Sequence, residues 1–278
     1  MANTLSYPAA TPAARGRQRL GGVVRTAEPF VLPIALFALW AVGAAQGWIP
    51  AQVLPSPQFV WETLSELATS GELWLHAQAS LQRVLVGFVA GSALGLLLGA
   101  FMGLSKTVEA YLLPAFNALV QIPVLGWLPF VLLLVGIGEP LKYILIAKAA
   151  LVPVTLATLQ GFRQTPAALL EVGDVYGYTR RQQVLEIVVP TAVPTLFTGL
   201  RLGFTKAWLS LVVVEPVASS EGLGYLIVYG RQLFQLDLVM AAVIIVGALG
   251  YAIDRLLDLA EARVAARHGA RTTAKGLL

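Results

Sequence analysis

The sequence of 278 residues contains no cysteine, which excludes a disulfide framework, a thiolate metal site and a cysteine nucleophile. Its two histidines, His76 and His268, lie far apart in the chain, so no histidine-based metal site is expected. No glycine is followed directly by lysine, so the phosphate-binding loop G-x-x-x-x-G-K-[ST] is missing. The sequence therefore predicts no catalytic residue, no metal and no cofactor bound by this chain, and the protein is not expected to be an enzyme.

Charge is also scarce. Asp, Glu, Lys and Arg make up 12% of the residues, against about 25% in a typical soluble domain, whereas hydrophobic residues make up 57%. An apolar helix crosses about 30 Å of hydrocarbon at 1.5 Å per residue. Pro114, Pro123 and Pro129 interrupt one of the apolar segments that are long enough to do so. The sequence predicts an all-α, polytopic integral membrane bundle of about six transmembrane helices, near residues 30–48, 84–104, 110–135, 141–159, 192–214 and 238–257.

Basic residues are unevenly distributed over the connections between these segments. Of the 19 Lys and Arg residues, 13 lie on one side of the predicted membrane, three on the other and three within spans. The positive-inside rule then places both termini and the polar segment 165–190 in the cytoplasm, and the protein in the cytoplasmic (inner) membrane. This placement, rather than nucleic acid, accounts for the net charge of +4.

The ends of the chain are expected to differ from its middle. We predict a disordered cytoplasmic tail over residues 1–28, a transmembrane domain over 29–259 and a cytoplasmic C-terminal tail over 260–278. A cleavable signal peptide is an alternative interpretation of the N-terminus, because arginines precede an apolar run there. Glu28 and Pro33 fit that alternative poorly.

The polar segment of residues 165–190, called the elbow below, begins with a helix signal. Thr165 fits an N-cap and Pro166 the first helical position, where its missing N–H costs nothing. The helix is expected to continue to Tyr176. Gly177 then breaks it, because glycine tolerates turn conformations that other residues resist.

A second helix is expected after this corner. Thr179 fits a capping box with Gln182, and Pro190 is expected to limit the helix at its far end. The elbow is thus predicted to be two short helices joined at a glycine and held outside the membrane between two spans. Such an element can transmit force from a soluble partner into the bilayer.

The elbow also carries a family pattern. Glu171 opens a Glu-x-x triplet, Gly177 follows after three residues, and Ile187 opens an Ile-x-x-Pro run after nine more. This pattern resembles the cytoplasmic loop signature of ABC importer permeases. The signature has alanine at the positions of Val172 and Gly173 and leucine at the position of Val189, so this chain departs from it at three residues. Other motifs resemble the nitrate, sulfonate and taurine branch of this binding-protein-dependent transport family: Leu54-Pro55-Ser56-Pro57, Trp127-Leu128-Pro129, Gly136-Ile137-Gly138-Glu139, Thr198-Gly199-Leu200-Arg201 and Gly222-Leu223-Gly224-Tyr225.

The resemblance implies a type I ABC importer permease fold, with residues 29–259 as the permease domain. It implies that the chain is the permease subunit, which pairs with a second copy, with two ATPase subunits that use the ATP, and with an extracytoplasmic solute-binding protein. The solute would be small and anionic, of the sulfonate, taurine or nitrate class. The elbow residues implied in coupling to the ATPases are Glu171, Gly173, Asp174, Gly177, Ile187 and Pro190.

A regular glycine series runs through the second apolar segment. Successive G-x-x-x-G steps indicate close helix packing. Each step of four residues advances by about 400°, so the stripe drifts by about 40° per step and suits a partner helix that crosses at an angle. The pattern leaves open whether this partner lies in the same chain or in another copy. The glycines are Gly87, Gly91, Gly95, Gly99 and Gly103.

Charged side chains inside the spans mark candidate positions on a solute pathway, because each costs roughly 2.5–3.5 kcal/mol near a helix centre and needs water or a partner. There are four such side chains. Lys148, Arg201 and Lys206 are cationic, which suits an anionic solute, and the fourth is Glu215. Proline also loosens a helix where a pathway needs irregular backbone. The proline-containing third apolar segment therefore adds two further candidates, Pro123 and Trp127. The candidates are Pro123, Trp127, Lys148, Arg201, Lys206 and Glu215.

Each candidate also has a purely structural interpretation. Arg201 lies eleven residues after Pro190 and can snorkel toward the cytoplasm. Lys206 and Glu215 can serve local pairing, and Trp127 can be an interfacial anchor or a packing residue.

Two other function classes are alternatives. A self-contained secondary transporter, driven by an ion gradient, would use the buried charges and need no ATPase. The short six-span length, the elbow motif and the lack of an obvious inverted repeat argue against it. An integral membrane enzyme is disfavoured by the lack of Cys and of clustered His and carboxylates.

Overall fold

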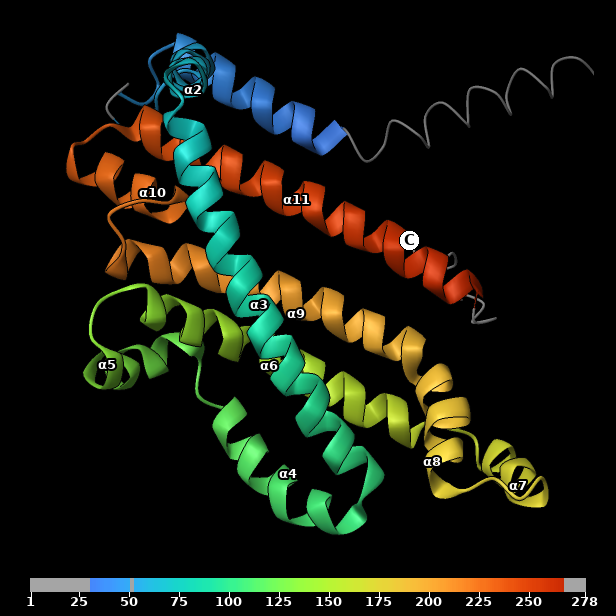
Figure 1. Ribbon diagram of the computed structural model, residues 1–278. Helices are drawn as coiled ribbons and strands as arrows, with labels where there is room; N and C mark the ends of the chain where they lie inside the picture. Colours follow the sequence, from blue (N-terminus) through green and yellow to red (C-terminus); the bar gives the residue numbers. More distant parts are fainter. Residues whose placement is uncertain (1–30, 51–52, 268–278) are drawn as a thin grey trace, which may run out of the picture. The chain divides into compact units, whose positions relative to one another are not determined.

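The computed structural model describes residues 31–50 and 53–267 (Figure 1). The chain divides into two compact units, one up to Glu62 and one from Thr63 onward. The first unit contains an apolar helix, Val31–Ala45, and the start of α2 (Pro57–Ser70). The predicted tail of residues 1–28 lies outside the described residues, as do residues 268–278 of the predicted C-terminal tail.

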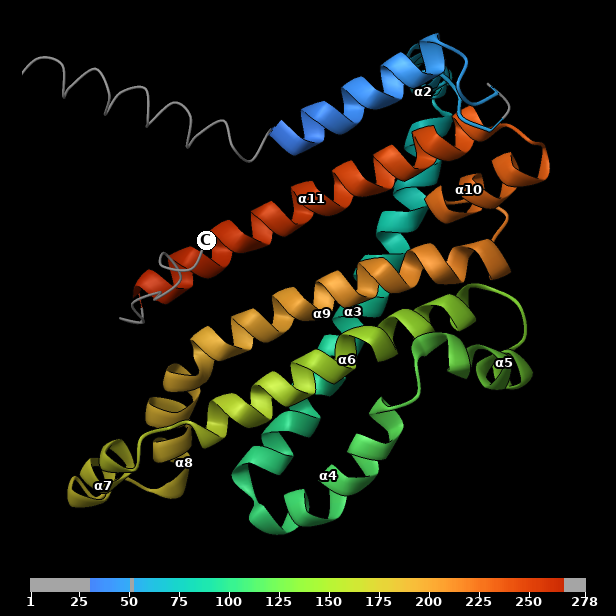
Figure 2. The same ribbon diagram turned by 180° about the vertical axis from the view of Figure 1, so that it is seen from behind.

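The second unit is entirely helical over the residues that the structure describes, which confirms the predicted all-α class. In both views α6, α9 and α11 run side by side, and α3 crosses α6 and α9 at an angle (Figures 1 and 2). The long helices are α3 (Glu72–Leu104), α6 (Glu139–Arg163), α9 (Val189–Ala218) and α11 (Leu236–Arg267). The short ones are α4 (Lys106–Val120), α5 (Val124–Val135), α7 (Ala167–Val175), α8 (Arg180–Gln182), the π-helix Gln183–Val188 and α10 (Leu223–Gln232).

Four helical segments are long and apolar enough to cross a membrane: Glu72–Leu104, Glu139–Arg163, Arg180–Ala218 and Leu236–Val264. The first predicted span corresponds to a shorter apolar helix of 15 described residues, Val31–Ala45. The third is not one continuous helix, because α4 and α5 meet at an angle of 97°. The break lies at Ile122–Pro123, since proline disfavours helical backbone in the residue before it and itself takes an extended conformation here (ψ 155°).

The glycine stripe of α3 lies against α6 of the same chain. A Cβ atom at Gly91 would collide with the backbone carbonyl of Ala147, and one at Gly95 would lie 2.9 Å from the carbonyl oxygen of Leu151. The stripe continues over two further turns, where a Cβ at Gly99 would lie 2.6 Å from the carbonyl oxygen of Thr155. The absence of side chains along this stripe therefore lets the two backbones touch, and it fixes α6 as the partner within this chain.

The elbow and α10 lie at opposite ends of α6 and α9 (Figures 1 and 2). The connection from α6 to α9 forms the elbow, and the connection from α9 to α11 contains α10. The candidate pathway residues of α5, α6 and α9 lie between these ends.

Candidate functional site

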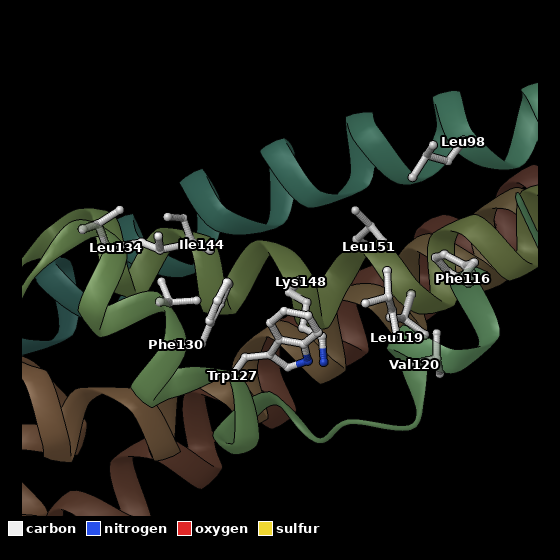
Figure 3. A pocket seen from close by; sticks show the side chains of 13 residues that line it. Leu98, Phe116, Leu119, Val120, Trp127, Phe130, Leu134, Ile144, Lys148 and Leu151 are labelled. Carbon is white, nitrogen blue, oxygen red and sulfur yellow. The ribbon is translucent and has the colours of Figure 1, made fainter.

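A cavity of about 400 Å³ lies between α3, α4, α5 and α6 (Figure 3). Thirteen residues line it, and eleven of these are Leu, Ile, Val or Phe. The remaining two are Trp127 of α5 and Lys148 of α6, which is the only charged residue in the lining. Trp127 lies in α5, beyond the 97° bend between α4 and α5, and contacts Lys148 of α6 there.

Lys148 and Trp127 form a pair on the wall of this cavity. The Lys148 ammonium lies 5.2 Å from the centre of the Trp127 ring and donates a hydrogen bond of 2.5 Å to the carbonyl oxygen of Ile122. This carbonyl is free to accept because the helix is interrupted at Pro123. The indole Nε1 of Trp127 is buried and has no acceptor among the described residues. Figure 3 shows the indole and ammonium nitrogens next to each other.

A second cavity, of about 560 Å³, shares Lys148 with the first and lies between the α4–α5 break, α6 and α9. Lys148, Pro123 and Lys206 all line it, together with Ser210, whose hydroxyl is buried and has no partner among the described residues. Four of the six candidate pathway residues therefore converge around these two cavities, and the structure brings them together from three helices.

Arg201 lies away from both cavities. Its guanidinium contacts three carboxylates of α11: Asp254 at 3.0 Å, Asp258 at 2.5 Å and Glu261 at 3.1 Å. Arg201 thus joins α9 to α11 near the elbow end of the bundle, and its charge is compensated by protein groups.

Glu215 is fully buried at the other end of α9. Its carboxylate accepts hydrogen bonds from Ser80 at 2.9 Å, from the Arg83 guanidinium at 2.8 Å and from the backbone N–H of Gly224 at 2.8 Å. A Cβ at Gly222 would strike this carboxylate, so the glycine before α10 makes room for it. Glu215 is therefore held by polar partners in α3 and α10 and faces neither cavity.

Arg83 is the centre of this cluster, and it was not among the predicted site residues. It is 2% exposed and also contacts Glu139 at 2.8 Å and Glu221 at 3.2 Å, while Lys142 contacts Glu139 at 2.7 Å. The second predicted span begins at residue 84 and so leaves Arg83 just outside it, but α3 begins at Glu72 and includes Arg83. One signal was available, since Arg83 precedes Gly87 by four residues and so extends the glycine stripe by one step.

The elbow differs from the prediction at the start of its first helix and at the expected end of its second helix. Thr165 does not cap the first helix: Pro166 occupies the N-cap, and the Thr165 hydroxyl is buried without a partner among the described residues. The reason is that Pro166 stays extended (ψ 130°), which moves the helix start to Ala167. Pro190 does not end the second helix, because it lies in the first turn of α9, where its missing N–H is tolerated after the wide π-helical turns.

The corner of the elbow agrees with the prediction. Gly177 has φ +70°, a conformation that L side chains rarely adopt, and Thr179 and Gln182 make both bonds of a capping box. The hydrogen bond and negative charge of Glu186 raise the pKa of the Tyr178 hydroxyl beside the corner.

Contacts across the corner hold α7 against the π-helix. Asp174 accepts a hydrogen bond of 2.5 Å from Gln183, and a Cβ at Gly173 would lie 2.9 Å from Cδ1 of Ile187. The end of α7 presents an apolar and uncovered surface, since Val175 is 86% exposed and Tyr176, the C-cap residue, is 77% exposed. Glu171 is exposed as well. An apolar face that projects from a helical bundle is suited to protein contact.

Residues 91–266 match the family described as binding-protein-dependent transport system inner membrane component. The chain belongs to this family. It is 38% identical over 249 residues to the putative aliphatic sulfonates transport permease protein SsuC of Bacillus subtilis (strain 168), covering 90% of this chain and 89% of the relative. It is 30% identical over 243 residues to the taurine transport system permease protein TauC of Escherichia coli (strain K12), covering 86% and 88%.

The fold of this family member is also found among solved structures. A chain of the MetNI methionine ABC transporter, in an inward-facing conformation, aligns with a TM-score of 0.56 and 20% sequence identity over 66% of this chain and 92% of that chain. The prediction of an ABC importer permease from the elbow motif is thus confirmed. The protein is a multi-pass inner-membrane permease subunit of a binding-protein-dependent transport system.

Proposed function

We propose that this permease imports small organic anions of the sulfonate class, and that the two cavities around Lys148 lie on their path. The observation that carries this proposal is the distribution of charge. Arg83, Lys142 and Arg201 each pair with carboxylates. Among the described residues, no carboxylate pairs with Lys148 or Lys206, and both line the second cavity.

An unpaired cation inside a span costs roughly 2.5–3.5 kcal/mol unless water or a counter-ion meets it. Two unpaired cations at one cavity are suited to bind an anion reversibly. The names of SsuC and TauC, which refer to aliphatic sulfonates and taurine, support the same class of solute. In this proposal Pro123 and Trp127 shape the path, whereas Arg201 and Glu215 hold helices together.

ATP is used by partners in this proposal. Two ATPase subunits dock on the exposed face of α7, in the cytoplasm together with both termini of the permease, which pairs with a second copy of itself. An extracytoplasmic binding protein delivers the solute. Movement of the ATPases reaches α9 through the α7 contacts with the π-helix, and the residues that carry it are Glu171, Gly173, Asp174, Gly177, Ile187 and Pro190.

The test is reconstitution of the permease with its ATPase and binding protein in proteoliposomes. Uptake of a labelled alkyl sulfonate should require ATP and should stop when Lys148 and Lys206 are both replaced by methionine. Uptake that persists without ATP and follows an imposed ion gradient would contradict the proposal and favour a secondary transporter.

A further inference from the structure

We propose that Lys148 and Trp127 bind the charged head of an organic anion whose apolar tail occupies the 400 Å³ cavity beside them. This inference rests on the proposed function, because the ligand is the transported solute. It goes further by assigning the two ends of the solute to different groups of the protein. It also separates alkyl sulfonates from inorganic anions such as nitrate.

The head-group end is defined by two groups that have N–H donors without acceptors among the described residues. An ammonium group has three N–H donors, and the only hydrogen bond of Lys148 among the described residues goes to the Ile122 carbonyl. The indole N–H of Trp127 is buried, and no acceptor for it lies in the described part of the chain. A buried donor without an acceptor is unfavourable, so a ligand that offers several acceptor oxygens at this point would bind. Sulfonate carries three such oxygens and a negative charge.

The tail end is defined by the wall of the cavity. Apart from the Lys148–Trp127 pair, every lining residue is Leu, Ile, Val or Phe. A small hydrated inorganic anion would lose its water against this wall without compensation. An alkyl chain would instead gain affinity, by roughly fourfold for each methylene group that leaves water. A volume of about 400 Å³ is within the usual range for small-molecule sites.

The second cavity explains why the head group is not trapped. It shares Lys148 with the first cavity and adds Lys206 and the unpartnered hydroxyl of Ser210. The head group therefore meets a second set of donors in the cavity that shares Lys148, so it can leave the first set without returning to an uncompensated position.

The test uses the assembled complex in proteoliposomes, with linear sulfonates from methanesulfonate to octanesulfonate and with nitrate. One binding protein serves all variants, so any change in chain-length preference between variants arises in the permease. Lys148→Met should reduce uptake of every sulfonate by at least about tenfold. Lys106→Met, which removes an exposed positive charge outside both cavities, is the matched control and should leave uptake unchanged.

The tail is tested by filling the cavity. Leu119→Trp places a larger ring in the cavity wall and should reduce octanesulfonate uptake by about tenfold more than methanesulfonate uptake. Leu112→Trp, on the same helix but outside both cavities, is the control. If Leu119→Trp reduced uptake equally for all chain lengths, or did not reduce it, the inference would be overturned. ATP-dependent uptake by the unaltered complex would still support the proposed function. If the unaltered complex carried no anion, both would fail.

Photolabelling identifies the occupant directly. A photoreactive octanesulfonate should label residues of α4 to α6, and excess octanesulfonate should suppress the label whereas octanol should not. Suppression by octanol as well would indicate a site for any alkyl chain, including that of a lipid, and would overturn the inference. Because the chain has no cysteine, cysteines placed at Leu119 can also report on a second copy. A disulfide between two copies there, without solute label, would assign the cavity to the subunit interface.

Discussion

The guanidinium of Arg83 and the carboxylate of Glu215 lie 2.8 Å apart, and both side chains are buried although 132 residues separate them in sequence. The pair joins α3 to α9. Glu139 and Glu221 extend the contact to α6 and to the loop before α10. Four segments of the second unit therefore meet at one arginine, at the end of the bundle opposite the elbow.

Replacing Arg83 with methionine should destabilise the permease strongly. Removal of one member of a buried ion pair leaves the other charge uncompensated, at a cost of about 3–5 kcal/mol. Glu215→Gln should cost less, because the amide oxygen can still accept from Ser80 and Gly224. The measurement is the thermal midpoint of the detergent-solubilised complex, with Arg231→Met at an exposed position as the control. Equal midpoints for the Arg83 and Arg231 variants would contradict the assigned role.

The glycine stripe predicts a position-specific effect of a single methyl group. Gly91→Ala should destabilise the protein by about 1–3 kcal/mol, because the new Cβ meets the Ala147 backbone, which cannot move alone. Gly247→Ala in α11 adds the same atom where nothing lies within 4 Å, and it should be neutral or slightly stabilising. The comparison is made by thermal unfolding of both variants. A neutral effect at Gly91 would contradict the backbone contact between α3 and α6.

Gly177→Val tests the corner of the elbow. Valine at φ +70° costs about 1–2 kcal/mol and should shift the direction in which α7 leaves the π-helix. We expect ATP hydrolysis to continue while solute uptake falls. Gly71→Val introduces the same strain at φ +84° before α3, outside the elbow, and should leave the ratio of uptake to hydrolysis unchanged. Full uptake and full solute-stimulated hydrolysis in the Gly177 variant would exclude this role of the corner.

The sequence predicted what depends on local pattern. The length of the apolar segments located the membrane helices, and the G-x-x-x-G period identified the packing face of α3. The sequence also identified Thr179 and Gln182 as the two members of the capping box. Each of these features depends on residues that lie close together in the sequence. The elbow motif identified the family for the same reason.

What the sequence could not predict depends on partners far along the chain. For Arg201 and Glu215 the sequence left a pathway role and a structural role open, because their carboxylate and guanidinium partners lie 53 to 132 residues away. Lys148 was distinguished from them only once those pairs were visible. The 97° bend at Pro123 also depends on tertiary context, because proline shows where a helix is interrupted but does not fix the direction of the next helix.

Gly173 gives the sharpest test of contact between α7 and the π-helix. A Cβ there would lie 2.9 Å from Cδ1 of Ile187, which is the movable end of a side chain, so Gly173→Ala should be tolerated. Gly173→Leu requires Ile187 to leave its place, and it should lower uptake per ATP hydrolysed.

The second change in this series removes the obstacle. Ile187→Ala should restore much of the coupling when combined with Gly173→Leu, because it clears the space that leucine needs. The ratio of uptake to hydrolysis in proteoliposomes is measured for both single variants and the double variant. If the double variant is no better than Gly173→Leu alone, the two residues do not act through their contact, and the movement of α7 must reach α9 through the Asp174–Gln183 hydrogen bond instead.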